Sequence, residues 1–405
     1  MSKFGYKDTI LLLGNGFDIS LNLPTSYICF MKTLTFLIDN KELNISNVGE
    51  VFGHINISKN DSECLIVKSY AQYKEVYDSC KIDTVKLSKM INDAEDNCWF
   101  SYFKNCLAKE MNWIDFESEI AIIIDSLKMF FESGNIEKII NEKTTYDQLR
   151  LMQNLSNFNK IFCKKPNTNS FWIRVEEDYI DRNNERINGK FIQKPKYEKI
   201  VNYFITSLNS FSGILKSYFE IFVDYPAKKM AEKGLLNLPN FLPEDAAVIS
   251  FNYTNTYEYI TKRDDIIHIH GNVRNNIVLG INPGSDDFSD NPDITYIKFK
   301  KYYQRAYYST EDNYIEFINC EKNMQGDFDG YSVKLIVFGH SLDITDKDII
   351  EDLFDIATEI KIYYHNDKAK ENYIENIVRI YGKSKYDNLR RNKDLALKPS
   401  ETKPL

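Results

Sequence analysis

The chain has 405 residues, of which 43% are hydrophobic and 14% aromatic, so it can bury one large core or two ordinary ones. This composition excludes a disordered chain. The net charge of −8 argues against a broad basic face for nucleic acid, although 51 Lys and Arg leave room for a local basic groove.

The seven cysteines indicate neither a zinc ribbon nor a disulfide framework, because their spacing is irregular and no Cys-x-x-Cys pair occurs. We expect them to be reduced and packed as small apolar side chains. The N-terminus lacks the apolar segment of a secretory signal. The most apolar stretch elsewhere, Ile120 to Phe131, is too short to span a bilayer. We therefore expect a soluble, cytoplasmic protein without membrane contact.

A buried strand is predicted at Thr9–Leu13, and it is followed at once by the glycine loop Gly14-Asn15-Gly16-Phe17-Asp18. Glycines at this place let the backbone approach a phosphate, which the N–H groups of the next helix can bind. A dinucleotide fingerprint has a third glycine at the position of Ile19, so a tight turn without a ligand remains the alternative. Downstream, Thr25 or Ser26 can cap a helix.

The middle of the chain is predicted to be mostly helical. Lys68–Met111, Trp113–Glu132 and Lys196–Phe222 carry apolar residues at helical spacing. Asn154–Pro195 is rich in polar residues and predicts loops with short elements. At i, i+4 spacing Trp113 and Glu117 share a helix face, where a solvated acid is the ordinary interpretation of Glu117 and a site role the weaker one.

Five further strands are predicted, and polar residues follow them. In an open α/β sheet, ligands bind beyond the carboxyl ends of the strands, so these polar residues predict a site there. The strands and their following residues are Ala247–Phe251 before Asn252, Ile266–Ile269 before His270, Ile277–Ile281 before Asn282, Lys334–Phe338 before Gly339-His340-Ser341, and Glu359–Tyr364 before His365.

Together these elements predict an α/β fold with a Rossmann-like, mainly parallel sheet and helices on both faces. The core is expected to be discontinuous, from residues 1–45 and 240–385. A large, mostly helical insertion at 46–239 interrupts it. Residues 386–405 are charged and contain proline, which predicts a frayed, flexible tail.

The residues that follow these strands differ in the chemistry that they could perform. Asn252 could orient a ribose or a water, or it could cap the following helix. His270, at a strand end beside a glycine, is placed to meet a ligand, whereas His268 is expected to pack within the strand. No cluster of Cys, Asp or Glu accompanies the two histidines, so no metal is expected.

The segment Gly339-His340-Ser341 lacks the second glycine of a G-x-S-x-G nucleophile elbow, so serine hydrolase chemistry is disfavoured. Asp343 and Asp346 lie beside a near capping box. They are therefore either weak site candidates or helix-start residues.

The order of the motifs is more specific than any one of them. Gly-Asn-Gly-Phe-Asp, Leu-Pro-Thr-Ser-Tyr, Trp-x-Asp-x-Glu, Phe-Asn-Tyr-Thr, His-x-His-Gly and Phe-Gly-His-Ser-Leu follow one another along the chain. This series resembles the bacterial phage abortive-infection AbiH family over about residues 1–35 and 245–365. The layout is also similar to the sirtuin-like NAD-binding superfamily, which many anti-phage NAD hydrolases use.

The resemblance implies NAD as a substrate or ligand. It places the cofactor on Gly14–Asp18, Thr25 and Gly339–Ser341, and it implies catalytic roles for Asn252 and His270. Where the superfamily's first loop usually carries Ala and Ser, this chain has Asn15 and Asp18. Where the superfamily has Asn-Tyr-Asp, it has Thr254 as the third residue. The chain lacks a four-Cys zinc ribbon, so protein deacetylation is not expected.

The functional expectation is an abortive-infection protein that hydrolyses the N-glycosidic bond of NAD to nicotinamide when a phage-derived trigger activates it. A homo-oligomer is among the partners considered. A non-enzymatic nucleotide-binding sensor and an RNA-directed toxin are the alternatives. The net negative charge, and the lack of a cluster of acidic residues that could bind a metal ion, count against the toxin.

Overall fold

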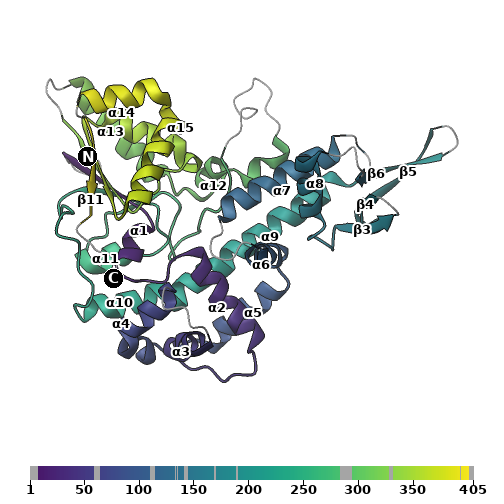
Figure 1. The fold of residues 1–405 in the computed structure, drawn as a ribbon, viewed down its shortest axis with the longest axis horizontal. Coiled ribbons are helices and arrows are strands. Elements are labelled where there is room, and N and C mark those ends of the chain that lie inside the picture. Colours follow the sequence, from purple (N-terminus) through teal and green to yellow (C-terminus); the bar gives the residue numbers. More distant parts are fainter. Residues whose placement is uncertain are drawn as a thin grey trace. The chain divides into compact units, whose positions relative to one another are not determined.

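The computed structural model describes residues 8–58, 64–109, 115–132, 134, 136–140, 145–167, 170–187, 190–282, 294–327, 332–392 and 394–400. Its contacts divide the chain into two compact units (Figure 1). Unit 1 comprises residues 1–91, 213–278 and 304–405, and unit 2 comprises residues 92–212 and 279–303. Residues 46–91 and 213–239, which we predicted to belong to the helical insertion, therefore group with the sheet.

Unit 1 is built on a six-stranded parallel sheet with the order β11-β10-β9-β1-β7-β8. The first strand, β1, lies inside the sheet, where Leu13 is opposite Phe338 of β9 on one side and Ser250 of β7 on the other. The predicted α/β class with a parallel sheet is thereby confirmed. The strands are β1 (Thr9–Leu13), β7 (Ala247–Ser250), β8 (Ile267–His268), β9 (Lys334–Phe338), β10 (Glu359–Tyr364) and β11 (Leu395–Pro399).

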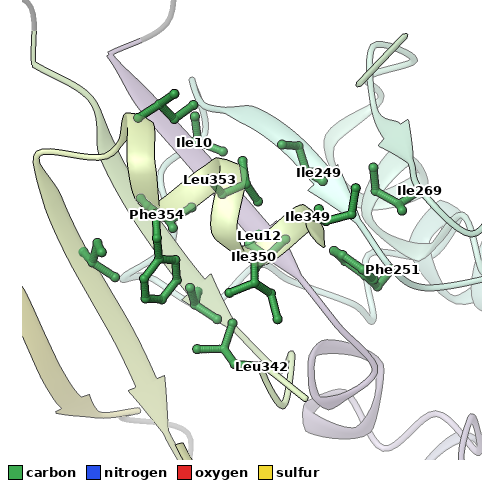
Figure 2. Packing of buried hydrophobic residues seen from close by; sticks show 14 of the residues in the cluster. Ile10, Leu12, Ile249, Phe251, Ile269, Leu342, Ile349, Ile350, Leu353 and Phe354 are labelled. Atoms are coloured by element: carbon green, nitrogen blue, oxygen red, sulfur yellow. The ribbon is translucent and has the colours of Figure 1, made fainter. Parts of the chain in front are cut away.

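Hydrophobic clusters cover both faces of this sheet, which explains why its strands are continuous apolar runs. Alternate residues of β1 point to opposite faces: Ile10 and Leu12 join one cluster, and Leu11 and Leu13 join the other. On the first face, helix α14 (Lys347–Ile356) packs its apolar side chains over the sheet (Figure 2). Each fully buried side chain of this kind contributes about 1.5–3 kcal/mol to stability.

The remaining helices form where the sequence has helical periodicity. Helix α2 is capped by the Ser26 side chain, which accepts a hydrogen bond from the Cys29 N–H. The α-helices besides α14 are α1 (Gly16–Ser20), α2 (Tyr27–Asp39), α3 (Val48–Ser58), α4 (Leu65–Ser79), α5 (Thr84–Glu95), α6 (Cys98–Lys109), α7 (Phe116–Phe131), α8 (Tyr146–Leu155), α9 (Tyr197–Tyr218), α10 (Tyr225–Glu232), α11 (Thr256–Thr261), α12 (Lys301–Tyr308), α13 (Asp312–Asp327) and α15 (Asp367–Arg391).

Unit 2 combines helices with antiparallel strands. Its core is aromatic, and Trp99 lies at its centre with ring contacts to Phe103, Phe158 and Phe204. The segment predicted as loops, Asn154–Pro195, instead forms antiparallel strand pairs from β3 (Phe162–Asn167), β4 (Ser170–Val175), β5 (Ile180–Ile187) and β6 (Lys190–Pro195), with β2 (Glu137–Ile140) pairing β4.

Two further expectations differ from the structure. Ile277–Ile281 is not a strand, because the segment follows an irregular path in which Val278 N–H donates to the His270 carbonyl and Ile281 makes only an isolated bridge. The predicted frayed tail is partly ordered: α15 continues to Arg391, and β11 pairs with β10. Among the β11 residues only Leu395 is fully buried, so the strand has little apolar periodicity to reveal it.

The loops after β1 and β9 touch through their backbones. The Gly14 and Gly16 N–H groups donate to the carbonyls of Phe338 and Gly339, at 3.1 and 2.8 Å. Gly339 has a φ of +75°, and a Cβ atom on it would lie 2.3 Å from the Phe17 nitrogen. Neither the conformation nor the space accepts a side chain, so the glycines of both loops are explained by this contact.

The glycine contact predicts a large loss of stability in Gly339→Ala, about 2–4 kcal/mol from the left-handed backbone and the steric overlap together. Gly234→Ala is the matched control, because Gly234 has a φ of +68° but no atom within 4 Å of the added Cβ. The control should lose only about 1–2 kcal/mol. Urea unfolding followed by circular dichroism measures both, and equal losses would contradict the explanation.

Candidate functional site

The carboxylate of Asp18 joins the ends of two neighbouring strands. Asp18 lies in α1, directly after β1, and only 1% of it is exposed. Its Oδ2 accepts hydrogen bonds from the Thr254 hydroxyl at 2.6 Å and from the Asn252 side-chain amide at 3.1 Å. Both donors follow β7, so the polar residues after adjacent parallel strands meet at the carboxyl edge of the sheet.

Burial raises the pKa of Asp18 from 3.8 to about 6. The hydrogen bond from the Thr254 hydroxyl opposes the shift, whereas the nearby acids Asp224 and Glu258 add to it. The carboxyl group therefore changes charge close to neutral pH, as groups at functional sites often do.

The carboxylate of Asp224 fixes the position of the loop that carries Asn252 and Thr254. This acid ends a π-helical segment, Phe219–Asp224, a rare element that is frequent at functional sites. Its carboxylate accepts hydrogen bonds from the Asn255 N–H and side-chain amide and from the Tyr259 hydroxyl, at 2.6–3.0 Å. Burial raises the pKa of Asp224, and these donors oppose the rise.

His268 is part of the hydrogen-bond network rather than of the apolar core. Its Nδ1 lies 3.0 Å from the Asn252 carbonyl, and its Nε2 lies 2.7 Å from Oε1 of Glu258 in α11. A carbonyl can only accept, so Nδ1 carries a proton. The imidazole thus connects the Asn252 loop to α11 through both of its ring nitrogens.

A second group, at the ends of β8 and β9, contains two histidines around one acid. Nε2 of His270 lies 3.1 Å from Oδ1 of Asp346, and Nε2 of His340 lies 3.5 Å from Oδ2. His340 Nδ1 accepts from the Leu342 N–H, so its Nε2 bears the proton that faces Asp346. The ring of Phe251 packs against both imidazoles.

The site residues that were predicted from the sequence therefore lie in separate parts of the structure. Asp18 meets Asn252, and His270, His340 and Asp346 meet one another. Asn15 and Ser341 are exposed, Phe17 belongs to the apolar cluster, and Asp343 caps a short 3-10 helix by accepting from the Thr345 N–H. Thr25 is buried just before α2.

Glu117 lies in unit 2, where its carboxylate pairs with the buried Lys301 ammonium at 2.7 Å. This ion pair gives Glu117 a structural role within that unit. Trp113, the other residue of the motif, lies outside the described residues.

Sequence reasoning missed Asp224, Glu258 and the polar role of His268, and it named Thr254 without predicting its bond to Asp18. Thr254 follows Asn252 by two residues, a spacing that offered the only signal. Asp224 and Glu258 lie on helical segments, where an acid is usually solvated, and only the fold brings them to the strand ends.

Two kinds of feature are absent from the described part of the chain. None of its helices is long and apolar enough to cross a membrane. Within the same residues, no group of three or more His, Cys, Asp or Glu side chains could hold a metal ion.

Fold and site together define an α/β protein that gathers carboxyl, amide and imidazole groups at the carboxyl edge of a parallel sheet. The family model described as "Bacteriophage abortive infection AbiH" matches residues 10–365. The match covers most of the chain, so the chain belongs to the AbiH family, and this membership implies a function in phage abortive infection. Neither the curated proteins nor the solved structures contain a match to the chain.

The raised pKa of Asp18 predicts a pH-dependent stability. Between pH 3.8 and about 6 the folded state holds a proton that the unfolded state has released, so the contribution of Asp18 falls as pH rises through this window. Relative to Asp18→Asn, the wild type should gain about 2–3 kcal/mol when the pH falls from 7 to 4. Urea unfolding at several pH values measures the difference.

The exposed Asp93→Asn variant is the matched control for this titration. The difference between wild type and this variant should not follow the same window. If the Asp18→Asn difference were flat between pH 4 and 7, the carboxyl group would not titrate there, and its burial in this polar cluster would be misjudged.

Proposed function

We propose that this AbiH-family protein hydrolyses NAD at the carboxyl edge of its sheet, with Asn252 and His270 as the catalytic residues. The observation that carries the proposal is a pair of buried acceptors. Within the described residues, Oδ1 of Asp18 and Oδ1 of Asn252 have no hydrogen-bond partner. Buried acceptors of this kind are costly unless a ligand donates to them, and ribose hydroxyls or a water would do so.

A reciprocal exchange of residues supports the resemblance to the sirtuin-like superfamily. That superfamily usually has Ser in the first loop and Asp after Asn-Tyr, whereas this chain has Asp18 and Thr254 in those places. The two departures therefore swap a hydroxyl and a carboxyl group. Thr254 donates to Asp18 at 2.6 Å, so in this chain a hydroxyl–carboxylate hydrogen bond joins the two loops.

The reaction depends more on the positions of the ribose and the water than on acid catalysis, because nicotinamide leaves NAD as a neutral molecule. Its bond to the ribose C1′ breaks while a water oxygen bonds to the same carbon, which yields ADP-ribose, nicotinamide and a proton. Asn252 would orient the ribose or the water. The Asp18 carboxylate would stabilise positive charge that develops on the sugar ring.

His270 would accept the proton from the attacking water or a ribose hydroxyl. Asp346, at 3.1 Å from its Nε2, is a positioning residue that stabilises the protonated ring. His340 holds the other oxygen of Asp346 and so fixes the orientation of this carboxylate.

The first test compares His270→Ala and Asn252→Ala with wild type in phage-infected cells and with purified protein. Each variant should release nicotinamide from NAD at least about 100-fold more slowly, the usual loss when a general base or positioning group is removed. His54→Ala is the matched control, because His54 is exposed on α3. The readouts are cellular NAD and free nicotinamide.

Nicotinamide release that survives in His270→Ala would overturn the assignment. Tight binding of NAD without turnover in the triggered wild type would favour the sensor. Degradation of RNA with unchanged NAD would favour the toxin.

The exchange of hydroxyl and carboxyl groups gives a second test. Thr254→Asp alone puts two buried carboxyl groups side by side and should cost about 3 kcal/mol or more of stability. The double variant Asp18→Ser/Thr254→Asp restores the pair in the other direction and should recover most of that loss. A double-mutant cycle by urea unfolding measures the coupling, and simple additivity would contradict a direct pair.

A further inference from the structure

A polar pocket opens beside the His268–Glu258 pair, and its lining residues all belong to unit 1. Its volume is about 620 Å³, within the range of roughly 300–1,000 Å³ that is usual for small-molecule sites. Neither Asp18 nor His270 lines it. The pocket is therefore distinct from the cluster to which the NAD proposal assigns catalysis.

Glu258 presents a buried acceptor to this pocket. Its side chain is 8% exposed, and Oε1 contacts His268 Nε2. Oε2 has no hydrogen-bond partner within the described residues. An unsatisfied carboxylate oxygen in a buried position requires a donor, and the pocket is the place from which a ligand could supply one.

The rest of the lining combines two cations with one further acid, Asp264, and several amides. Arg274 lies over the ring of Tyr259, 5.8 Å from its centroid, and Lys216 Nζ donates to the Asn275 carbonyl. Each cation keeps N–H groups beyond these contacts, and both line the pocket together with Asn272, Asn276 and Asn313. Cations suit a phosphate, and a carboxylate beside amides suits sugar hydroxyls.

We propose that this pocket binds a phosphorylated ribose, with its hydroxyl groups donating to Glu258 and its phosphate accepting from Arg274 and Lys216. The shared chemistry could come from free ribose 5-phosphate or from a nucleotide. The volume accommodates a mononucleotide.

The pocket and the candidate site share one neighbour, Asn252, which His268 contacts at its backbone carbonyl and Asp18 at its side-chain amide. Glu258 contacts His268, His268 Nδ1 donates to the Asn252 carbonyl, and the Asn252 side chain donates to Asp18. A ligand that donates to Glu258 Oε2 draws electron density from Oε1. Any effect of the ligand on catalysis through this contact rests on the proposed function, whereas binding itself does not.

The experiment is calorimetric titration of the full chain with four probes: AMP, ribose 5-phosphate, adenosine and inorganic phosphate. AMP and ribose 5-phosphate should bind, and adenosine and phosphate should bind at least tenfold more weakly because each lacks half of the recognised group. Glu258→Gln and Arg274→Met should each weaken AMP binding about tenfold or more. Arg274 is exposed, so its replacement does not disturb the core.

Glu244→Gln, an exposed acid of the same unit, is the matched control and should bind AMP as the wild type does. Asn252→Ala should also keep AMP binding, although it abolishes the proposed NAD hydrolysis. Loss of binding in Asn252→Ala with no effect of Arg274→Met would assign the ligand to the strand-end cluster and overturn the proposal. Equal binding of adenosine and AMP, or binding of none of the probes, would also overturn it.

Discussion

A carboxylate that is buried at the end of a central strand must be hydrogen-bonded. Asp18 is such a carboxylate, and its need for donors determines which residues lie beside it at the edge of the sheet. Its partners come from the loop after β7, which in turn needs Asp224 to satisfy Asn255 and Tyr259. The polar loops are therefore fixed by a network in which each acid holds the next segment. Rigid side chains at a strand end are what a site needs to orient a reacting sugar.

The other constraint is the backbone contact between the loops after β1 and β9. The N–H groups of Gly14 and Gly16 are used in this contact, so any phosphate at this loop would be bound by other N–H groups. The glycines remain necessary, but for packing. Two described cations, Lys216 and Arg274, line the separate pocket beside Glu258.

The sequence was informative where a residue's role follows from its neighbours along the chain. The apolar runs gave β1, β9 and β10 with their observed ends, and position after a strand was enough to single out Asn252 and His270. The sequence did not reveal the residues whose roles depend on tertiary packing. In the sequence, Glu258 and Asp224 cannot be told from ordinary solvent-exposed acids of a helix. Strand β11 depends on its pairing with β10, in which Ile360 lies opposite Leu395.

The strand order has a consequence for the synthesis of the protein. Leu13 pairs with Phe338, which leaves the ribosome long after it, on the order of 20–60 s later at ordinary rates of translation. Until then β1 has no neighbour on that side, and the loop of Gly339 cannot close against Gly16. An unfinished chain therefore cannot yet bring His340 and Asp346 beside His270.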